Sequence, residues 1–233
     1  MNKTYSKLLK GIKQYFKKSG FAKAVIGVSG GIDSALSLKL VADALGSNNV
    51  TALLMPESGL DHWHNLHDAR DFCKKLNVDS KIIHISLILD KFRKYKQNHQ
   101  SWTNLKPRIR AVLLYNYANA NNASVIGTSN KTELALGYFT KHGDGACDIE
   151  VIGDLYKTEV LKLAKYLKLP EHIINKTPSA DLFKGQTDEG EIGETYANID
   201  LMLQGKKKMS KRIKELIEKN KHKTQPIPII KTH

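Results

Sequence analysis

Apolar and polar positions along the chain alternate between two periods. Apolar runs of four to six residues, each typical of a buried strand, occur at residues 25–28, 50–55, 81–86 and 124–127. Between and after these runs, apolar residues recur with the i, i+3, i+4, i+7 spacing of one helix face. Five such stripes begin at Leu38, Ala69, Ile109, Val160 and Ile192. The pattern therefore predicts strands that alternate with helices.

This alternation predicts an α/β fold, a doubly wound parallel sheet with helices on both faces. We expect Pro107 to lie near the first turn of the third helix. Residues 90–106 and 138–154 show no clear period, and we expect them to form long loops. Ligands of such sheets bind beyond the carboxyl ends of the strands, where the strand order reverses. The expected site residues lie within 29–34, 56–59 and 128–133.

Length and composition indicate one large domain, although two small ones also fit 233 residues. We expect a core at about residues 11–203 and a basic tail at about residues 205–233. No run approaches the roughly 20 apolar residues of a membrane span. The N-terminal stretch lacks the apolar region of a signal peptide, and we expect a cytoplasmic location with no membrane partner. Cys73 and Cys147 are predicted to be free thiols, with Cys73 facing a core.

Positive charge is concentrated near the C-terminus. The formal net charge is +14, and residues 206–223 carry nine Lys or Arg against two Glu, which is +7 or half of the total. A solvated basic tail explains this block, and so does a clamp for a polyanionic ligand. Charge alone leaves both open.

The most informative short stretch is Gly-Val-Ser-Gly-Gly-Ile-Asp-Ser at residues 27–34, between the first strand and its helix. It matches neither the Walker A nor the dinucleotide pattern. Gly30 and Gly31 leave room for backbone N–H groups to approach a phosphate, and the helix N-terminus favours an anion. Asp33 beside a phosphate calls for a divalent cation between them. A simple turn capped by Asp33 is the alternative, but the full pattern favours nucleotide binding.

A second strand–turn–helix stretch, Val-Ile-Gly-Thr-Ser-Asn-Lys-Thr-Glu at residues 125–133, supplies another carboxylate. Alone, Glu133 is compatible with an ordinary helix-start glutamate. Together with Asp33 it gives Mg²⁺ two carboxylate ligands. His62, His64 and His67 also lie close together, but a solvated loop is favoured there because no Cys or second cluster accompanies them.

The Ser-Gly-Gly-Ile-Asp-Ser motif resembles the pyrophosphatase loop of enzymes that split ATP between the α and β phosphates. Two further stretches narrow the family: Gly-Tyr-Phe-Thr-Lys-His-Gly-Asp-Gly-Ala-Cys-Asp at 137–148 and Pro-Ser-Ala-Asp-Leu at 178–182. With them the chain resembles the ammonia-dependent NAD synthetases. The resemblance runs from about residue 11 to 203, with a further short match at residues 222–223.

This resemblance implies a Rossmann-like, adenine nucleotide α-hydrolase-like fold and the last step of NAD biosynthesis. ATP adenylates nicotinic acid adenine dinucleotide, pyrophosphate leaves, and ammonia displaces AMP to give NAD. It also implies Mg²⁺ and a homodimer with the dinucleotide at the subunit interface. No nucleic-acid partner is expected.

The family's site residues transfer one by one to matching positions. The resemblance implies ATP contacts at Gly27, Val28, Ser29, Gly30, Gly31, Ile32, Asp33, Ser34, Thr128, Lys157 and Ser179. It implies dinucleotide contacts at Arg108, Lys141, Asp148, His222 and Lys223, and Mg²⁺ ligands at Asp33 and Glu133. The catalytic set is Asp33, Glu133, Lys157 and, as a group that assists ammonia, Asp148.

Some of these residues also have plainer interpretations. Taken alone, Lys157 and Arg108 are equally compatible with surface cations, and Asp144 with Gly145 is compatible with a plain turn. The chain departs from relatives at Leu54, where some carry a basic residue, and at Ser179, where threonine is common.

Two other functions remain open from the residues alone. A tRNA-modifying ATP pyrophosphatase would use the same loop and the basic tail, and a nucleotide-binding module would lack turnover. We expect direct use of free ammonia, because neither cysteine is placed for a glutaminase and one expected helix precedes the loop.

Overall fold

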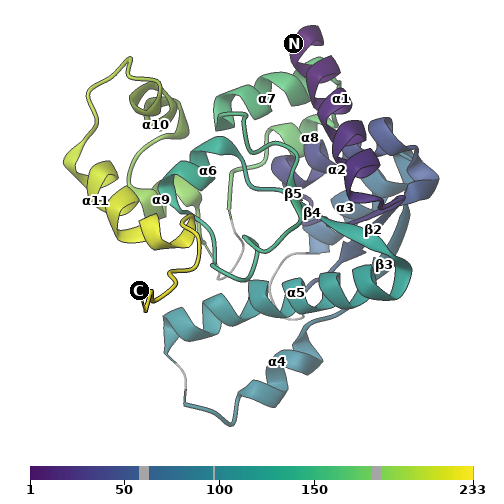
Figure 1. Cartoon of the computed structure of the whole chain (residues 1–233), viewed down its shortest axis with the longest axis horizontal. Helices are drawn as coiled ribbons and strands as arrows, with labels where there is room; N and C mark the ends of the chain where they lie inside the picture. Colours follow the sequence, from purple (N-terminus) through teal and green to yellow (C-terminus); the bar gives the residue numbers. More distant parts are fainter. Residues whose placement is uncertain (58–62, 97, 180–184, 233) are drawn as a thin grey trace.

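The computed structural model describes residues 1–57, 63–96, 98–179 and 185–232 (Figure 1). At its centre is a five-stranded sheet in the order β3-β2-β1-β4-β5, with every neighbouring pair parallel. The strands are β1 (Lys23–Gly27), β2 (Val50–Leu54), β3 (Asp79–Ile82), β4 (Ala123–Gly127) and β5 (Ile149–Glu150). The predicted doubly wound parallel class is confirmed, and the strand order reverses between β1 and β4.

Alternate residues of the central strands enter two different cores. Ala24 and Ile26 of β1 pack into one cluster, whereas Val25 between them packs into the other. The first cluster is covered by α1 (Asn2–Ser19), α2 (Ile32–Leu45), α3 (Trp63–Lys75), α7 (Lys157–Tyr166) and α8 (Glu171–Ile174). The second is covered by α4 (Ser86–Phe92) and α5 (His99–Asn121), which lie below the sheet in Figure 1. Burial on both faces explains why the central strands β1, β2 and β4 are mostly apolar rather than alternating.

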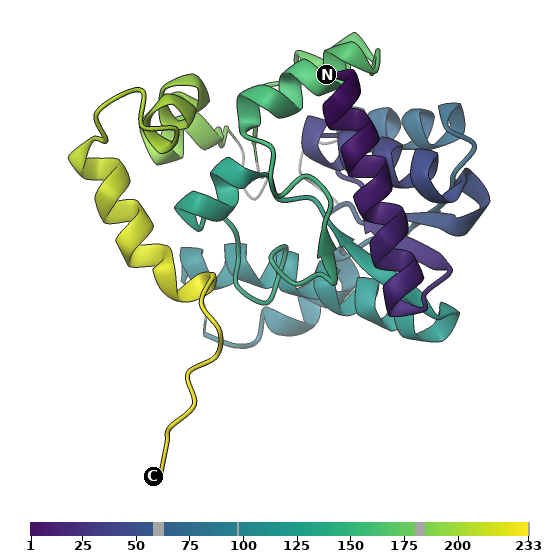
Figure 2. The ribbon, with the colours of Figure 1, turned by 45° about the horizontal axis from the view of Figure 1, so that its top comes forward.

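A third, smaller cluster lies beside the sheet and is built by α6 together with helices from the C-terminal part of the chain. Its helices are α6 (Lys131–Leu136), α9 (Asp188–Ile192), α10 (Tyr196–Leu203) and α11 (Lys211–Asn220). The 3₁₀ turn η2 (Lys221–Lys223) directly follows α11. The basic block is therefore largely a helix rather than a solvated tail, because Ile213 of α11 is fully buried against this cluster. Beyond η2, residues 224–232 are exposed and extend away from the body (Figure 2).

Several predicted element boundaries were wrong. The expected loop at residues 90–106 contains the end of α4 and the start of α5, and Pro107 lies inside α5 rather than near its start. Asn98 caps α5 by accepting a hydrogen bond from Ser101 N at 2.8 Å, a local signal that outweighed the weak apolar period. The predicted strand at 81–86 is split, since β3 ends at Ile82 and Ser86 begins α4.

A further prediction merged two helices. Ile192 ends α9, and Gly193 with φ of 79° separates it from α10. The 3₁₀ turn η1 (Ser47–Asn49) leads from α2 into β2. Cys73 is buried and Cys147 half-buried, both as free thiols, as predicted. Among the described helices, none has the length and apolarity to cross a bilayer.

Candidate active site

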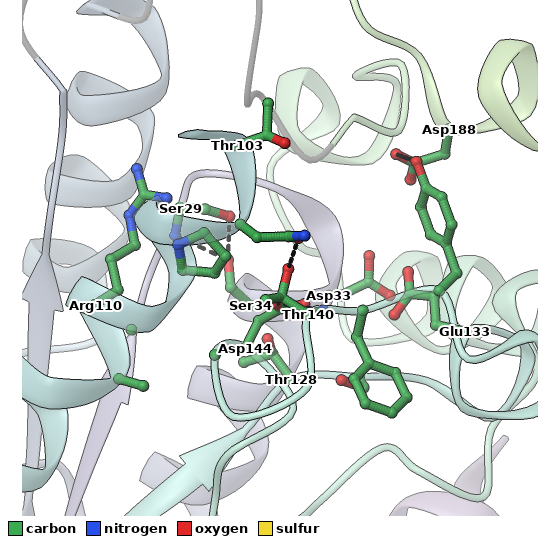
Figure 3. Close-up of a pocket in the computed structure, with 18 of the residues that line it drawn as sticks. Ser29, Asp33, Ser34, Thr103, Arg110, Thr128, Glu133, Thr140, Asp144 and Asp188 are labelled. Atoms are coloured by element: carbon green, nitrogen blue, oxygen red, sulfur yellow. Dashed lines mark hydrogen bonds between the residues drawn. The ribbon is translucent and has the colours of Figure 1, made fainter. Parts of the chain in front are cut away.

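A cavity of about 970 Å³ opens at the carboxyl ends of β1, β2 and β4. Its position at the reversal of strand order agrees with the prediction for a doubly wound sheet. Figure 3 shows that side chains from both sides of this reversal, among them Asp33 and Glu133, point into the same space. The volume is near the upper end of the range for ligand pockets, which suits a large ligand or two ligands side by side.

Six residues of the glycine loop, residues 27–34, line one wall of this cavity, and Gly30 and Gly31 are not among them. Gly31 N donates to Ser29 Oγ at 3.2 Å, and Ser34 Oγ donates to the Gly31 carbonyl at 3.0 Å. Gly31 is also the N-cap residue of α2, so the positive end of that helix faces the loop. Ser29 and Ser34 both line the cavity. The wall therefore presents hydroxyl groups and a helix N-terminus, the chemistry of a phosphate site.

Gly30 is required by the packing of the loop against α3. Its φ is +82°, and a Cβ there would lie 2.4 Å from the carbonyl oxygen of Asn65 on α3. A Cβ on Gly31 would meet only Ser29 Oγ at 3.4 Å, an ordinary contact. The two adjacent glycines thus differ: Gly30 lets α3 approach the loop, whereas Gly31 leaves the N-terminus of α2 open.

Two carboxylates from different strand ends converge on one ammonium group. Lys157 Nζ lies 2.5 Å from Asp33 Oδ2 and 3.4 Å from Glu133 Oε1. Asn130 Nδ2 donates to the other oxygen of Asp33 at 2.9 Å. Lys157 is 7% exposed, so the interpretation of it as a surface lysine is wrong. The loops after β1 and β4 are joined through this cluster.

The electrostatics of the cluster follow from burial and proximity. Burial, together with the Asp33 carboxylate, raises the pKa of Glu133, although Lys157 opposes the shift. Burial alone would lower the pKa of Lys157, but Asp33 and Glu133 outweigh it and raise that pKa. Asp188, 5% exposed, is a third carboxylate whose pKa is raised chiefly by burial. One ammonium among three carboxylates leaves an excess of negative charge, which a divalent cation would neutralise.

The donor set fits a Mg²⁺ ion that arrives with a nucleotide. Among the residues that the structure describes, no group of three or more His, Cys, Asp or Glu is arranged to hold a metal. Asp33 and Glu133 nevertheless lie within reach of one cation, the Lys157 ammonium. Mg²⁺ commonly binds through one or two carboxylates plus phosphate oxygens. His64 and His67 lie on α3 outside any such group, and His62 is outside the described residues.

Glu133 is held by the first turn of its own helix. Asn130, the N-cap residue of α6, accepts from Glu133 N at 3.0 Å, and Glu133 Oε2 accepts from Asn130 N at 3.1 Å. This reciprocal capping box fixes one carboxylate oxygen. The other oxygen faces Lys157. The alternative role of a helix-start glutamate therefore coexists with the role in the cluster.

A buried carboxylate that the sequence did not reveal joins α6 to α7. Asp200 of α10 is 2% exposed, and it accepts from Thr132 Oγ1 at 2.5 Å and from Thr158 N at 2.9 Å. Thr132 Oγ1 in turn accepts from Lys157 N at 3.0 Å. Asp200 therefore sets the relative position of the helices that carry Glu133 and Lys157.

Asp188 accepts hydrogen bonds from two tyrosines beside the cluster. It accepts from Tyr196 OH at 2.9 Å and from Tyr138 OH at 3.4 Å. Lys157 Nζ lies 4.9 Å from the Tyr196 ring centroid, a cation–π distance. Asp188 and Tyr196 belong to a stretch, residues 188–200, that has no strand-end signal. Only tertiary packing brings them to the cluster.

Four of the predicted substrate residues lie together in a cationic wall, made of Arg108, Lys141, His222 and Lys223. Arg108 Nε donates to the Lys141 carbonyl at 3.4 Å, and Lys141 Nζ donates to the His222 carbonyl at 2.8 Å. Lys223 Nζ donates to the Gly137 carbonyl at 2.7 Å. All four residues line the cavity. The end of the basic block thus faces the same space as the glycine loop.

Asp148 is not brought to this wall and is not among the residues that line the cavity. It accepts from Tyr115 OH of α5 at 3.1 Å and from Val125 N at 2.8 Å. Asp144, which the sequence also allowed as a plain turn residue, does line the cavity and accepts from Thr140 N at 3.0 Å.

The remaining predicted residues lie around the rim and floor. Gly27, Val28, Ile32, Thr128 and Ser179 line the cavity. Of residues 56–59, Pro56 and Glu57 line it, and 58–59 lie outside the described residues. Glu150 of β5 accepts from Ser129 N at 3.0 Å and so supports the turn beside Thr128. Burial raises the pKa of Glu150 to about 7.

Comparison with known proteins agrees with this geometry. The chain matches the family model described as NAD synthase over residues 4–228. An NH(3)-dependent NAD(+) synthetase from Archaeoglobus fulgidus is 43% identical over 227 residues, which cover 94% of this chain and 92% of that protein.

Solved structures resemble the chain over nearly its whole length. An NMN synthetase from Francisella tularensis superposes with a TM-score of 0.91 at 35% identity, covering 100% of this chain and 98% of its own. An NH3-dependent NAD synthetase from Campylobacter jejuni, in complex with the nitrate ion, gives 0.83 at 36% identity and covers 99% of both chains.

Proposed function

The chain belongs to the NAD synthase family, and from this premise we propose that it converts nicotinic acid adenine dinucleotide to NAD with ammonia and ATP. It is a ligase that forms a C–N bond, as its NH(3)-dependent relatives are. The observation that carries the proposal is the convergence of Asp33, Glu133 and Lys157 beside the glycine loop. The cationic wall faces the same cavity.

ATP binds with its leaving phosphates in the glycine loop. The hydroxyl groups of Ser29 and Ser34 and the N-terminus of α2 surround that position. Thr128 and Ser179 line the cavity nearby. Asp33 and Glu133 would hold Mg²⁺, which would neutralise charge on the phosphate oxygens. Lys157 supplies a fixed positive charge next to the reacting phosphate.

The reaction needs two displacements and no covalent enzyme intermediate. A nicotinate carboxylate oxygen attacks the α phosphorus of ATP, and the α–β P–O bond breaks to release pyrophosphate. The ammonia nitrogen then attacks the acyl carbon, loses a proton, and AMP leaves with its oxygen. The protein's task is to hold two large anions side by side, for which the glycine loop and the cationic wall provide two separate anion sites.

The active form is proposed to be a homodimer that shares the dinucleotide. Asp148, an expected contact of that ligand, lies outside the cavity, whereas the other four contacts line it. In the proposed dimer, Asp148 of one chain would contact a dinucleotide held in the cavity of the other. Sedimentation as a dimer, with weaker dinucleotide binding by Asp148→Asn, would support this arrangement. A chain that sediments as an active monomer would contradict it.

The first experiment is NAD formation from nicotinic acid adenine dinucleotide with ATP, Mg²⁺ and ammonium, scored for AMP and pyrophosphate. NAD is expected only when all components are present. Release of AMP without formation of NAD would support the ATP site but show that the acceptor is a different molecule. A rate with glutamine equal to that with ammonium would overturn the choice of free ammonia.

A second candidate substrate is nicotinic acid mononucleotide. The superposition is better on the Francisella tularensis NMN synthetase than on the Campylobacter jejuni NAD synthetase, 0.91 against 0.83, at similar identity. The same chemistry on the smaller acceptor would yield NMN. The ratio of kcat/KM for the two acceptors decides between them, and we expect the dinucleotide to be preferred because the matched curated relatives make NAD.

The tRNA-modifying alternative is not favoured, since both the family match and the relatives concern NAD synthesis. Lys223 of the basic block is committed to carbonyl groups at the cavity. We also propose that the chain forms a single domain and acts in the cytoplasm. Tight, salt-sensitive binding of tRNA would reopen the alternative.

A further inference from the structure

Lys176 lies next to the glycine loop and is not among the residues that line the cavity. Its Nζ donates to the Gly30 carbonyl at 3.1 Å and to Asp68 Oδ2 at 3.0 Å. Lys176 follows α8, and Asp68 belongs to α3. Two elements distant in sequence therefore meet at one carbonyl group of the loop.

That carbonyl group shares its peptide plane with the N–H of Gly31. The described chain has no cis peptide bond, and in a trans peptide the C=O and N–H point in opposite directions. Holding the Gly30 carbonyl toward Lys176 therefore turns the Gly31 N–H the other way, toward Ser29 Oγ at 3.2 Å. Gly30, at φ of +82°, has no Cβ to restrict this plane, and the contacts with Lys176 and Ser29 hold its two ends.

We propose that Lys176 is a positioning residue, which orients the Gly30–Gly31 peptide so that its N–H can bind the pyrophosphate part of ATP. Asp68 holds the ammonium group in place. Because the Lys176–Asp68 pair is neutral overall, its contribution is orientation rather than added positive charge. The inference rests on the proposed function, in which this loop binds the leaving phosphates.

A contribution to folding alone is a poor explanation for the pair. The side chains of Lys176 and Asp68 are 26% and 22% exposed, and partly exposed ion pairs stabilise proteins little. His172 Nε2 is a second polar neighbour of Asp68, at 3.5 Å. Asp68 is therefore not left without a partner when Lys176 is removed, and the variant should fold.

The test measures binding of inorganic pyrophosphate, Mg-ATP and nicotinic acid adenine dinucleotide by calorimetry. Lys176→Met should weaken the binding of pyrophosphate and ATP about tenfold, the scale of one charge-assisted hydrogen bond. Its affinity for the dinucleotide should be unchanged. Lys176→Arg should restore part of the loss. Asp68→Asn should have a smaller effect in the same direction. Lys165→Met, at an exposed position of α7, is the matched control and should bind all three ligands normally.

In steady-state assays Lys176→Met should raise KM for ATP and leave KM for the dinucleotide unchanged. Equal weakening of all three ligands, with a lowered melting temperature, would show a merely structural lysine and overturn the inference. Wild-type affinity of Lys176→Met for pyrophosphate would also overturn it. A wild-type chain that binds neither pyrophosphate nor ATP would overturn the proposed function first, and this inference with it.

Discussion

The two walls of the cavity are built from different kinds of chemical group. The glycine loop presents backbone and hydroxyl groups of consecutive residues, and it rests on the large cluster between the sheet and α2. The cationic wall presents long side chains from α5, from the segment after α6 and from η2. Part of it rests on the small cluster around Leu136 and Ile213. A small cluster opens at lower free energy than a large one, so the cationic wall is expected to be the more easily deformed.

The comparison also explains what the sequence could reveal. A wall of consecutive residues leaves a short motif at a strand end, and residues 27–34 were therefore identified together with their strand and helix. A wall of separated residues leaves no such motif. Arg108, Lys141, His222 and Lys223 were found only through family resemblance.

The largest effect is expected at the two carboxylates that contact Lys157. Asp33→Asn and Glu133→Gln should each lower kcat for NAD formation by a factor of about 10² to 10³ or more, because the phosphate charge is no longer neutralised. AMP and pyrophosphate release should fall with it. Asp154→Asn is the control, since that side chain is 91% exposed. Near-normal turnover by either site variant would contradict the proposed metal site.

Gly30→Ala should break the glycine loop alone. The added Cβ would lie 2.4 Å from the Asn65 carbonyl oxygen at a positive φ, and such strain costs about 1–3 kcal/mol. We expect a lower melting temperature and weaker ATP binding, with dinucleotide binding retained. Gly11→Ala is the control, because a Cβ there meets nothing within 4 Å. An equal loss of affinity for ATP and for the dinucleotide would show that the two walls are not independent.

Ile213→Ala should loosen the opposite wall. Ile213 is fully buried in the small cluster, and truncation of a buried isoleucine to alanine costs about 2–5 kcal/mol. Hydrogen exchange should speed up in α10 and α11 but not in β1 or α2, and KM should rise for the dinucleotide more than for ATP. Ile229→Ala, at an 84% exposed position, should change neither. Uniform acceleration across the chain would argue for a single cooperative unit.

The last effect concerns the pH dependence of stability and leaves activity aside. Burial raises the pKa of Glu150 from 4.5 to about 7, so the folded chain binds this proton more tightly than the unfolded chain. Its contribution to stability is fully present below pH 4.5 and is lost as pH rises through about 7. Glu150→Gln should flatten this part of the pH profile by about 1–3 kcal/mol, measured by urea unfolding at pH 5 and pH 8. Glu218→Gln, 74% exposed, should keep the wild-type profile.

Much of the fold was predictable, for reasons that particular elements make clear. β1, β2 and β4 are buried on both faces, so their apolar runs stand out in the sequence. β5 has only two residues, Ile149–Glu150, and gave no signal. α5 was misjudged over its first half because its hydrophobic pattern is weak and Pro107 lies in its interior. Its cap at Asn98 was the signal that could have placed its start.

The site was predictable where it depends on strand ends and unpredictable where it depends on packing. Asp33 and Glu133 follow β1 and β4, which are neighbours in the sheet, and their meeting follows from that topology. Asp188 and Asp200 come from the helices beyond the sheet. They reach the cluster only because Tyr196, Ile199 and Met202 of α10 pack against α6 through the small cluster. No local pattern encodes that contact.

The long helix α5 also fixes the distance between two groups of contacts. Near its middle, Arg110 anchors it to the Met55 carbonyl at the end of β2, and Arg108 reaches the cationic wall. Tyr115, seven residues beyond Arg108 or about 10 Å along the axis, holds Asp148 outside the cavity. One helix thus sets the spacing between Arg108 at the cavity and Asp148 outside it, the two places where the proposed dimer would contact the dinucleotide. A single residue inserted between Arg108 and Tyr115 would turn one set by about 100° against the other, leaving each intact and the two out of register.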